Sequence, residues 1–160
     1  MIEIKEFSFE MQYEIERFFE KCFIDLGWDY EPSGRHFDTT HIQDSYMSNG
    51  CMWCMYKNNR IIGTVAIRTI DNFEKIAEMK RLYVIKDEQG NGYGSMLFET
   101  ALRYAKESGF YKICADTQND RDASQHLMRK HGFKEISQYN DNDFAELFFE
   151  LIIKDENKNS

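Results

Sequence analysis

Apolar residues recur along the chain with two periods, one typical of strands and one typical of helices. Residues 2–7 alternate apolar and polar side chains, which predicts a first strand. A stripe at helical spacing then predicts a helix that ends at Gly27. The members of this stripe are Ile15, Phe18, Phe19, Cys22, Phe23 and Leu26. Residues 28–37 indicate a loop, and Asp38 is a suitable cap for a short helix over 39–48.

The rest of the chain predicts a mixed sheet. Apolar runs at 51–57 and 60–70, joined by a turn that contains two asparagines, predict a hairpin. The elements that follow are a strand over 76–85, a helix that ends at Gly109, a strand over 111–115, a helix over 122–131 and strands over 133–139 and 143–153. Because a helix separates the strands at 76–85 and 111–115, we expect these two strands to be parallel, with a right-handed crossover.

The predicted fold class is therefore α/β (α+β). We expect a single domain over residues 1–153, with a mixed, mostly antiparallel central sheet, one parallel βαβ unit and helices on both faces. Residues 154–160 form a polar C-terminal tail that we expect to be disordered.

A glycine-rich segment joins the strand at 76–85 to the next helix. It consists of Gln89, Gly90, Asn91, Gly92, Tyr93 and Gly94. Glycines let the backbone approach a ligand closely, and the first amides of a helix are unpaired, so the segment favours a phosphate or pyrophosphate ligand. A plain turn is the alternative. The segment lacks the lysine of a Walker loop. It also departs from the dinucleotide-binding fingerprint, because Ser95 stands where that motif has its last glycine.

The glycine segment resembles the Q/R-x-x-G-x-G/A signature of the GNAT superfamily of N-acetyltransferases. Residues 78–84 resemble the family's strand before this loop, 63–66 resemble the preceding hairpin strand, and 132–133 resemble the Gly-Phe after the last helix. The resemblance implies a GNAT-like acetyltransferase domain. It also implies transfer of an acetyl group from acetyl-CoA to a primary amine, of a small molecule or a peptide, by direct attack in a ternary complex.

The same resemblance implies where acetyl-CoA binds. The pyrophosphate would lie on the amides of the loop and helix, and the pantetheine arm would pair with the strand before the loop, in a gap where that strand diverges from the next. The residues implied are Leu82, Tyr83, Val84, Gln89, Gly90, Asn91, Gly92, Tyr93, Gly94 and Ser95. Arg121 replaces a family asparagine and is a further cofactor candidate, with a solvated arginine as the alternative.

An amine attacks a thioester only after losing a proton, and the charge that forms on the carbonyl oxygen needs a donor. Glu78 is the candidate general base, because it lies on the strand that would carry the thioester contacts. The alternative for Glu78 is a carboxylate paired with Lys80 or Arg60. By resemblance, the oxyanion donor is the backbone N–H of Leu82 or Val84.

The general acid departs from the family pattern. Met128 occupies the position of the family's usual tyrosine, and a thioether cannot donate a proton. A thiolate leaves readily because the pKa of a thiol is near 8.5, so this departure weakens catalysis without excluding it. Tyr83, Tyr139 and His131 are the candidate replacements.

By resemblance, the acceptor approaches from the first helix and the loop after it. Trp28, Tyr30 and Tyr46, with the carboxylates near them in sequence, suit a cationic amine. Arg35 and His36 would instead suit an acceptor carboxylate. A polar surface loop with no ligand is the third interpretation.

Composition narrows the classes of partner. The chain has 160 residues, 28 acidic and 20 basic, which gives a net charge of −8 and argues against a broad nucleic-acid surface. With no apolar run of membrane-spanning length and no basic, apolar leader, we expect a cytoplasmic protein without a membrane partner. The four cysteines fit buried thiols better than a metal or redox site, so no metal is expected. A homodimer is a family-level expectation.

Two other functions remain open at this stage. A catalytically weak or inactive CoA-binding sensor or scaffold would explain Met128. A simple phosphate- or nucleotide-binding module would explain the glycine segment alone, and it would bind ADP as well as CoA.

Overall fold

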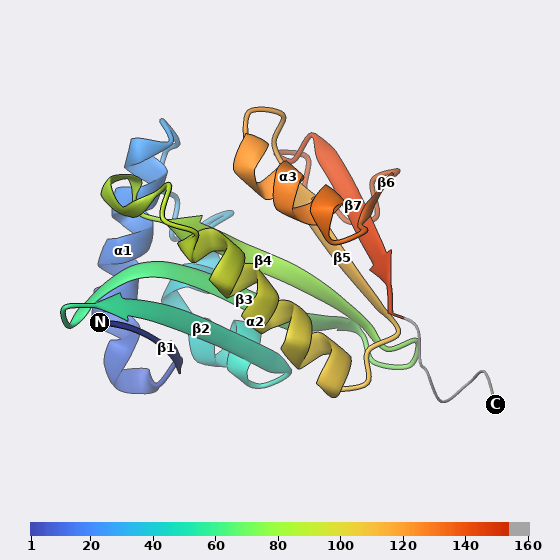
Figure 1. Cartoon of the computed structure of the whole chain (residues 1–160), viewed down its shortest axis with the longest axis horizontal. Coiled ribbons are helices and arrows are strands. Elements are labelled where there is room, and N and C mark those ends of the chain that lie inside the picture. Colours follow the sequence, from blue (N-terminus) through green and yellow to red (C-terminus); the bar gives the residue numbers. More distant parts are fainter. Residues whose placement is uncertain (154–160) are drawn as a thin grey trace.

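A computed structural model describes residues 1–153, which form one seven-stranded sheet with three α-helices packed on it (Figure 1). The strands are β1 (Ile2–Glu6), β2 (Gly50–Lys57), β3 (Arg60–Asp71), β4 (Ile76–Val84), β5 (Lys112–Thr117), β6 (Lys134–Ile136) and β7 (Leu147–Ile152). The helices are α1 (Gln12–Asp25), α2 (Tyr93–Glu107) and α3 (Asp122–Lys130). Short helical turns are η1 (Phe9–Met11), η2 (Phe37–Thr40), η3 (Gln43–Met47) and η4 (Lys86–Glu88). The tail predicted over 154–160 lies outside the described residues.

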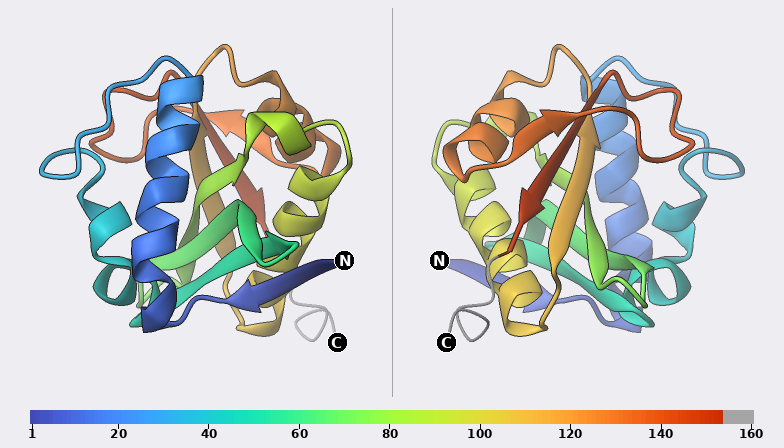
Figure 2. Two further views of the ribbon diagram at one scale, coloured as in Figure 1. Left: turned by 90° about the vertical axis from the view of Figure 1, so that its left-hand side faces the viewer. Right: turned by 90° about the vertical axis from the view of Figure 1, so that its right-hand side faces the viewer.

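The strand order is β1-β2-β3-β4-β5-β7-β6, and every neighbouring pair is antiparallel except β4 and β5. Helix α2 connects that parallel pair, as the βαβ pattern requires. In Figure 2, α2 and α3 cover one face of the sheet, while α1, η2 and η3 cover the other. The predicted fold class is confirmed.

The apolar stripes predicted from the sequence form the packing faces of α1 and α2. Five members of the α1 stripe are buried, whereas Leu26 lies just after the helix and is half-buried. On α2 the buried face consists of Leu97, Phe98, Ala101, Leu102 and Ala105. The strand β3 is buried from Ile61 to Ile67, because helices pack on both of its faces.

Two sequence expectations are wrong. Residues 39–48 do not form one helix that Asp38 caps, because the segment breaks into η2 and η3, and the Asp38 carboxylate pairs with Arg81 instead. The last two strands are also shorter than predicted, because 137–146 forms a loop. Several polar side chains of this loop hydrogen bond to carboxylates on the sheet rather than extending a ladder.

A β-bulge changes the course of β4. Arg81 and Leu82 stand opposite the single residue Val65 of β3, and Arg81 has a positive φ of 56°. The hydroxyl of Thr64, which is fully buried, donates to the Arg81 carbonyl at 2.8 Å. The ladder between β4 and β5 ends at Met79 and Ala115, although both strands continue. The two strands therefore diverge where the bulge begins.

The bulge hydrogen bond predicts a stability difference between two threonines of β3. Thr64→Val keeps the shape of this fully buried side chain but removes the donor to the Arg81 carbonyl, so we expect a loss of about 1–3 kcal/mol in the free energy of unfolding. Thr69→Val is the control, because the Thr69 hydroxyl bonds the Asn49 carbonyl at a site that water can reach, and we expect a loss below about 0.5 kcal/mol. Urea unfolding measures both; equal losses would contradict the role assigned to Thr64.

Candidate functional site

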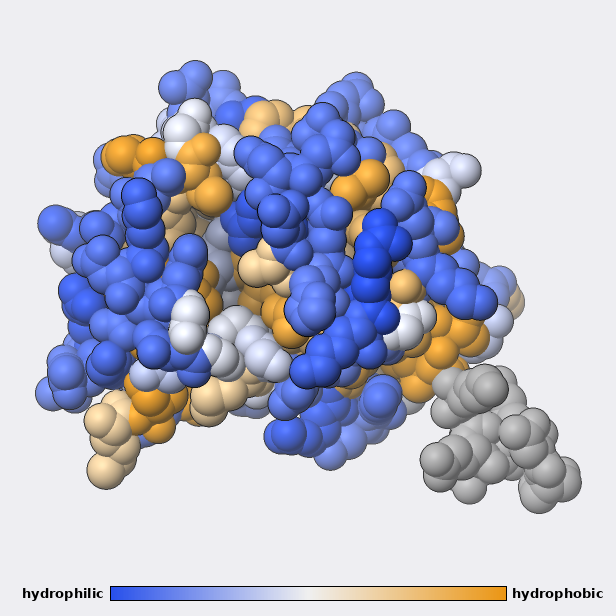
Figure 3. Space-filling view, turned by 45° about the horizontal axis from the view of Figure 1, so that its top comes forward, coloured by the Kyte–Doolittle hydropathy of each residue, from blue (hydrophilic) through white to orange (hydrophobic). Residues whose placement is uncertain are grey.

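A cavity of about 370 Å³ opens at the point where β4 and β5 diverge. One wall consists of β4 from Met79 to Tyr83, and the other consists of the end of β5 together with Ser124 and Met128 of α3. The loop after α1 and the loop 137–146 close the remaining sides. Figure 3 shows mainly hydrophilic side chains over one face of the molecule, with more apolar groups in the hollow between them. The volume suits a small molecule or the end of an extended arm.

The edge of β4 that faces the gap has no strand partner beyond the ladder with β5. The amide of Ile85 bonds the Ile62 carbonyl of β3, so by alternation the amides and carbonyls of Leu82 and Val84 point the other way. Side chains cover both carbonyls: Arg121 Nη2 donates to the Leu82 oxygen at 3.2 Å, and Gln89 Nε2 donates to the Val84 oxygen at 2.9 Å. An extended ligand can bind along this edge as a further strand would.

The glycine segment ends at the exposed N-terminus of α2. Gly90 and Gly92 have φ values of 84° and 80°, which glycine adopts without strain, and no atom lies within 4 Å of the position of a Cβ on either residue. Gly92 precedes the first helical residue, and its carbonyl accepts the amide of Met96 at 3.2 Å. The amides of the first turn, from Tyr93 to Ser95, have no partner in the helix and carry the positive end of its dipole.

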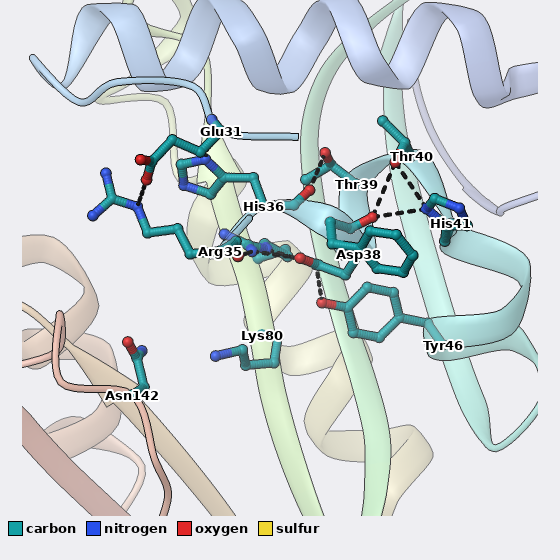
Figure 4. A network of polar contacts seen from close by, with 12 residues as sticks. Glu31, Arg35, His36, Asp38, Thr39, Thr40, His41, Tyr46, Lys80 and Asn142 are labelled. Carbon is teal, nitrogen blue, oxygen red and sulfur yellow. Dashed lines mark hydrogen bonds and ion pairs between the residues drawn. The ribbon is translucent and has the colours of Figure 1, made fainter. Parts of the chain in front are cut away.

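A buried ion pair attaches the loop after α1 to the bulge. The Arg81 guanidinium donates to both oxygens of Asp38, at 2.8 and 2.6 Å, and the Tyr46 hydroxyl also donates to Asp38 (Figure 4). Burial raises the pKa of Asp38, but the two hydrogen bonds and the charge of Arg81 outweigh it, so the pKa lies below its usual value. Asp38 is therefore ionised, and both of its oxygens already accept hydrogen bonds.

Glu78 lies below the cavity, on β4, and its side chain is only 1% exposed. Arg68 donates to one of its oxygens, at 2.9 and 2.7 Å, whereas Tyr139 and Asn140 donate to the other, at 2.5 and 3.1 Å. Burial and the adjacent Glu78 raise the pKa of Tyr139 far above its usual value. The partner of Glu78 is thus Arg68, not Lys80 or Arg60, and neither Glu78 nor Tyr139 lines the cavity.

The other general-acid candidates occupy different places. His131 is directed at the Leu127 carbonyl and packs on Phe98, away from the cavity. Met128 lines the cavity as a buried thioether. Tyr83 also lines it. Among residues 1–153 its hydroxyl has one hydrogen bond, which it accepts from Arg81 at 3.4 Å, so the hydroxyl proton is available. Arg121 stacks on the Tyr83 ring at 5.1 Å.

Two of the three predicted acceptor residues, Trp28 and Tyr46, line the cavity. Tyr30 does not; its hydroxyl bonds Thr39 behind the cavity wall. Sequence reasoning missed the loop residue Phe144, which packs edge-on against Trp28 and lies under the Arg35 guanidinium at 3.8 Å. The polar run 140–143 was the available signal, but nothing local in the sequence connects it to this cavity.

The four cysteines are buried and free. Burial raises the pKa of Cys51 and Cys54 to about 12, so both are thiols at neutral pH. Among residues 1–153, no helix has the length and apolar character needed to cross a membrane.

The sequence of the chain matches the model of the acetyltransferase (GNAT) family over residues 10–133. The chain belongs to this family. The glycine segment, the bulged β4 and the diverging strands are therefore parts of a GNAT fold, and the resemblance seen in the sequence is confirmed.

Relatives and solved structures agree with this GNAT assignment. A probable N-acetyltransferase, camello, of Xenopus tropicalis is 28% identical over 99 residues, which cover 61% of this chain and 45% of the relative. The chain spans about half the length of the curated relatives it matches. A GNAT acetyltransferase of Staphylococcus aureus Mu50 has the same fold, with a TM-score of 0.85, 21% identity and 96% and 100% of the two chains covered. A GNAT acetyltransferase of Brucella melitensis, solved with acetyl-CoA, superposes with a TM-score of 0.71 at 15% identity, over 97% and 90% of the two chains.

His36 makes the stability of this GNAT domain depend on pH. Burial, aided by Arg81 and Arg35, lowers its pKa to about 4, and its Nδ1 accepts the Glu31 amide at 2.9 Å. In the unfolded chain a histidine takes up a proton below about pH 6.5, so stability falls as pH drops from 6.5 toward 4.

We expect His36→Asn to remove this histidine's contribution to the slope, which approaches about 1.4 kcal/mol per pH unit. Phe73→Asn is the control, because this exposed side chain does not titrate, and it should keep the wild-type slope. Urea unfolding at several pH values compares the slopes, whatever the absolute stability of each variant. A slope for His36→Asn that matches the wild type would overturn the assignment.

Proposed function

We propose that the chain is an N-acetyltransferase that moves an acetyl group from acetyl-CoA to a primary amine. The observation that carries this proposal is the cavity at the divergence of β4 and β5, because it joins the open edge of β4 to the loops of the opposite face. A thioester bound along that edge would meet an amine that enters between the loops. Family membership supports the same chemistry.

In this proposal, acetyl-CoA lies across the two features that have unsatisfied backbone donors. Its pyrophosphate binds the amides from Gly90 to Ser95, where two glycines leave open space and the α2 dipole favours negative charge. Its pantetheine arm pairs with Leu82 and Val84. Because Arg121 now donates to the Leu82 carbonyl, the arm must displace this guanidinium from the edge.

The amine nitrogen then bonds to the thioester carbon, and the C–S bond breaks as the tetrahedral intermediate collapses. The backbone N–H of Leu82 is the proposed donor to the oxygen that becomes charged. Tyr83 is the proposed proton donor to the leaving thiolate, because its hydroxyl proton is available in the cavity. The thiolate can also leave unprotonated, since the pKa of a thiol is near 8.5.

The amine proton passes to water in this scheme. Both oxygens of Glu78 accept close hydrogen bonds and the side chain is buried, so we propose that Glu78 holds Arg68 and the loop 137–146 in place. Acceptance of the proton by Glu78 would require these contacts to open first.

A CoA-binding sensor without turnover is the second candidate. Met128 favours it, because the buried thioether stands in the cavity where the family's tyrosine would be and cannot donate a proton. Release of CoA thiol in the presence of amines separates the two functions.

A glycine substitution tests the proposed pyrophosphate site. Gly92→Ala strains a positive φ and places a methyl group in the open space above the loop, so we expect the Kd for acetyl-CoA to rise at least about tenfold. Gly109→Ala is the matched control: Gly109 has φ 81°, equally open surroundings and a position at the other end of α2. The Kd of Gly109→Ala for acetyl-CoA should change less than about twofold. Calorimetric titration measures the Kd of both variants. Equal weakening in both variants would argue against this site.

Thermal melts with acetyl-CoA, CoA and ADP, followed by thiol release with a panel of primary amines, test the function as a whole. Ligand at 100 times its Kd adds about 2.7 kcal/mol, which should raise Tm by several degrees. We expect a larger shift with acetyl-CoA than with ADP, and thiol release with at least one amine. Binding of acetyl-CoA without release from any amine would favour the sensor, and no shift with any ligand would exclude both functions.

A further inference from the structure

Lys80 is a cation in the cavity with hydrogen-bonding capacity that the fold leaves unused. It lies on β4 just before the bulge, its side chain is only 16% exposed, and it lines the cavity. Its one polar contact among residues 1–153 is an ion pair with Asp116 Oδ1 at 3.6 Å, too long for a hydrogen bond. Figure 4 shows the Lys80 side chain extending toward Asn142 and away from the pair formed by Asp38 and Tyr46. An ammonium group has three donors, so Lys80 can bind an anionic group.

The carboxylates near Lys80 are occupied by other donors. Asp38 accepts from Arg81 and Tyr46 through both oxygens. Asp116 Oδ2 accepts from Asn140 and Asn142, at 2.8 and 3.2 Å. The third lining carboxylate, Asp141, is exposed on the loop at the cavity rim. A second ammonium group would therefore find few free acceptors in the interior of the cavity.

The cavity also has the opposite charge balance to the chain. Five basic and three acidic side chains line it, whereas the whole chain has 28 acidic and 20 basic residues. Two of the basic residues, Arg35 and Arg68, pair with glutamates outside the lining. Among the described residues, Lys80 and Arg121 are the lining cations with no carboxylate oxygen within hydrogen-bond distance.

We propose that the acceptor is a small amine that also carries a carboxylate, of the amino-acid class, and that Lys80 binds this carboxylate. The proposal rests on the acetyltransferase function proposed above. Lys80 and Leu82 lie on either side of Arg81 in the bulge and both line the cavity, so one small molecule can place its carboxylate on Lys80 and its amine at the thioester. This adds a carboxylate to the cationic amine that Trp28, Tyr30 and Tyr46 led us to expect from the sequence.

Matched acceptors test the proposal directly. Acetyl transfer is measured by thiol release for a panel of free amino acids, for the carboxamide of each, and for simple diamines. Loss of the carboxylate removes a charge-assisted hydrogen bond, so kcat/KM for the best amino acid should exceed that for its carboxamide at least about tenfold. Carboxamides or diamines that react as well as the acids would overturn the proposal.

Substitutions of Lys80 test whether this side chain causes the preference for amino acids over their carboxamides. Lys80→Met should reduce the ratio of kcat/KM for acid over carboxamide to about twofold or less, and Lys80→Arg should keep most of it. Lys112→Met is the matched control, because Lys112 lies on β5 outside the cavity and pairs with Glu150 at 3.1 Å. It should keep the full ratio. A ratio that Lys80→Met leaves unchanged would contradict the role of Lys80.

The same assays separate failure of this inference from failure of the proposed function. Transfer to carboxamides or diamines without preference for acids would reject the carboxylate and retain the acetyltransferase. Binding of acetyl-CoA without transfer to any acceptor would reject both in favour of the sensor.

Discussion

Because two residues of β4 stand opposite one residue of β3, β4 turns away from β5 after Met79. This single irregularity produces the open backbone edge at Leu82 and Val84 and the cavity beside it. A regular β4 would continue its ladder with β5, and its amides and carbonyls would then be occupied by the next strand. The proposed site of acetyl transfer therefore depends on a local loss of pairing in the centre of the sheet.

Several contacts hold the bulge in place. Thr64 satisfies the displaced carbonyl, and the Arg81 side chain crosses to Asp38, which brings the loop after α1 against β4. A buried ion pair adds little stability when intact, but loss of one partner leaves a buried charge and costs about 3–5 kcal/mol. The ion pair between Arg81 and Asp38 thus serves mainly to fix the position of the loop after α1 in the cavity wall. Glu78 and Asp116 hold the opposite loop through hydrogen bonds that they accept from its tyrosine and asparagine side chains.

The parts of the site that the sequence predicted are those encoded by neighbouring residues. The glycine segment, the first turn of α2 and the βαβ unit each follow from local spacing, and so does the burial of the α1 stripe. The acceptor side could not be predicted in the same way, because its contacts join distant segments: Asp38 with Arg81, 43 residues apart, and Glu78 with Tyr139, 61 residues apart. Asp38 is a residue type that often caps a helix, and only the folded chain shows that its carboxylate forms an ion pair with Arg81 instead. Lys80 and Glu78 share a strand face, but Arg68, Tyr139 and Asn140 occupy the Glu78 carboxylate, whereas Lys80 lines the cavity.

The central claim is that acetyl-CoA pairs with the open edge of β4. Residue-resolved amide hydrogen exchange, recorded by NMR with and without saturating acetyl-CoA, tests it most directly. The account predicts that the amides of Leu82 and Val84 exchange more slowly in the complex, together with those from Gly90 to Ser95. The amides between β1 and β2, on the far side of the sheet, should not change. Unchanged exchange at Leu82 and Val84 in a saturated complex would contradict the account.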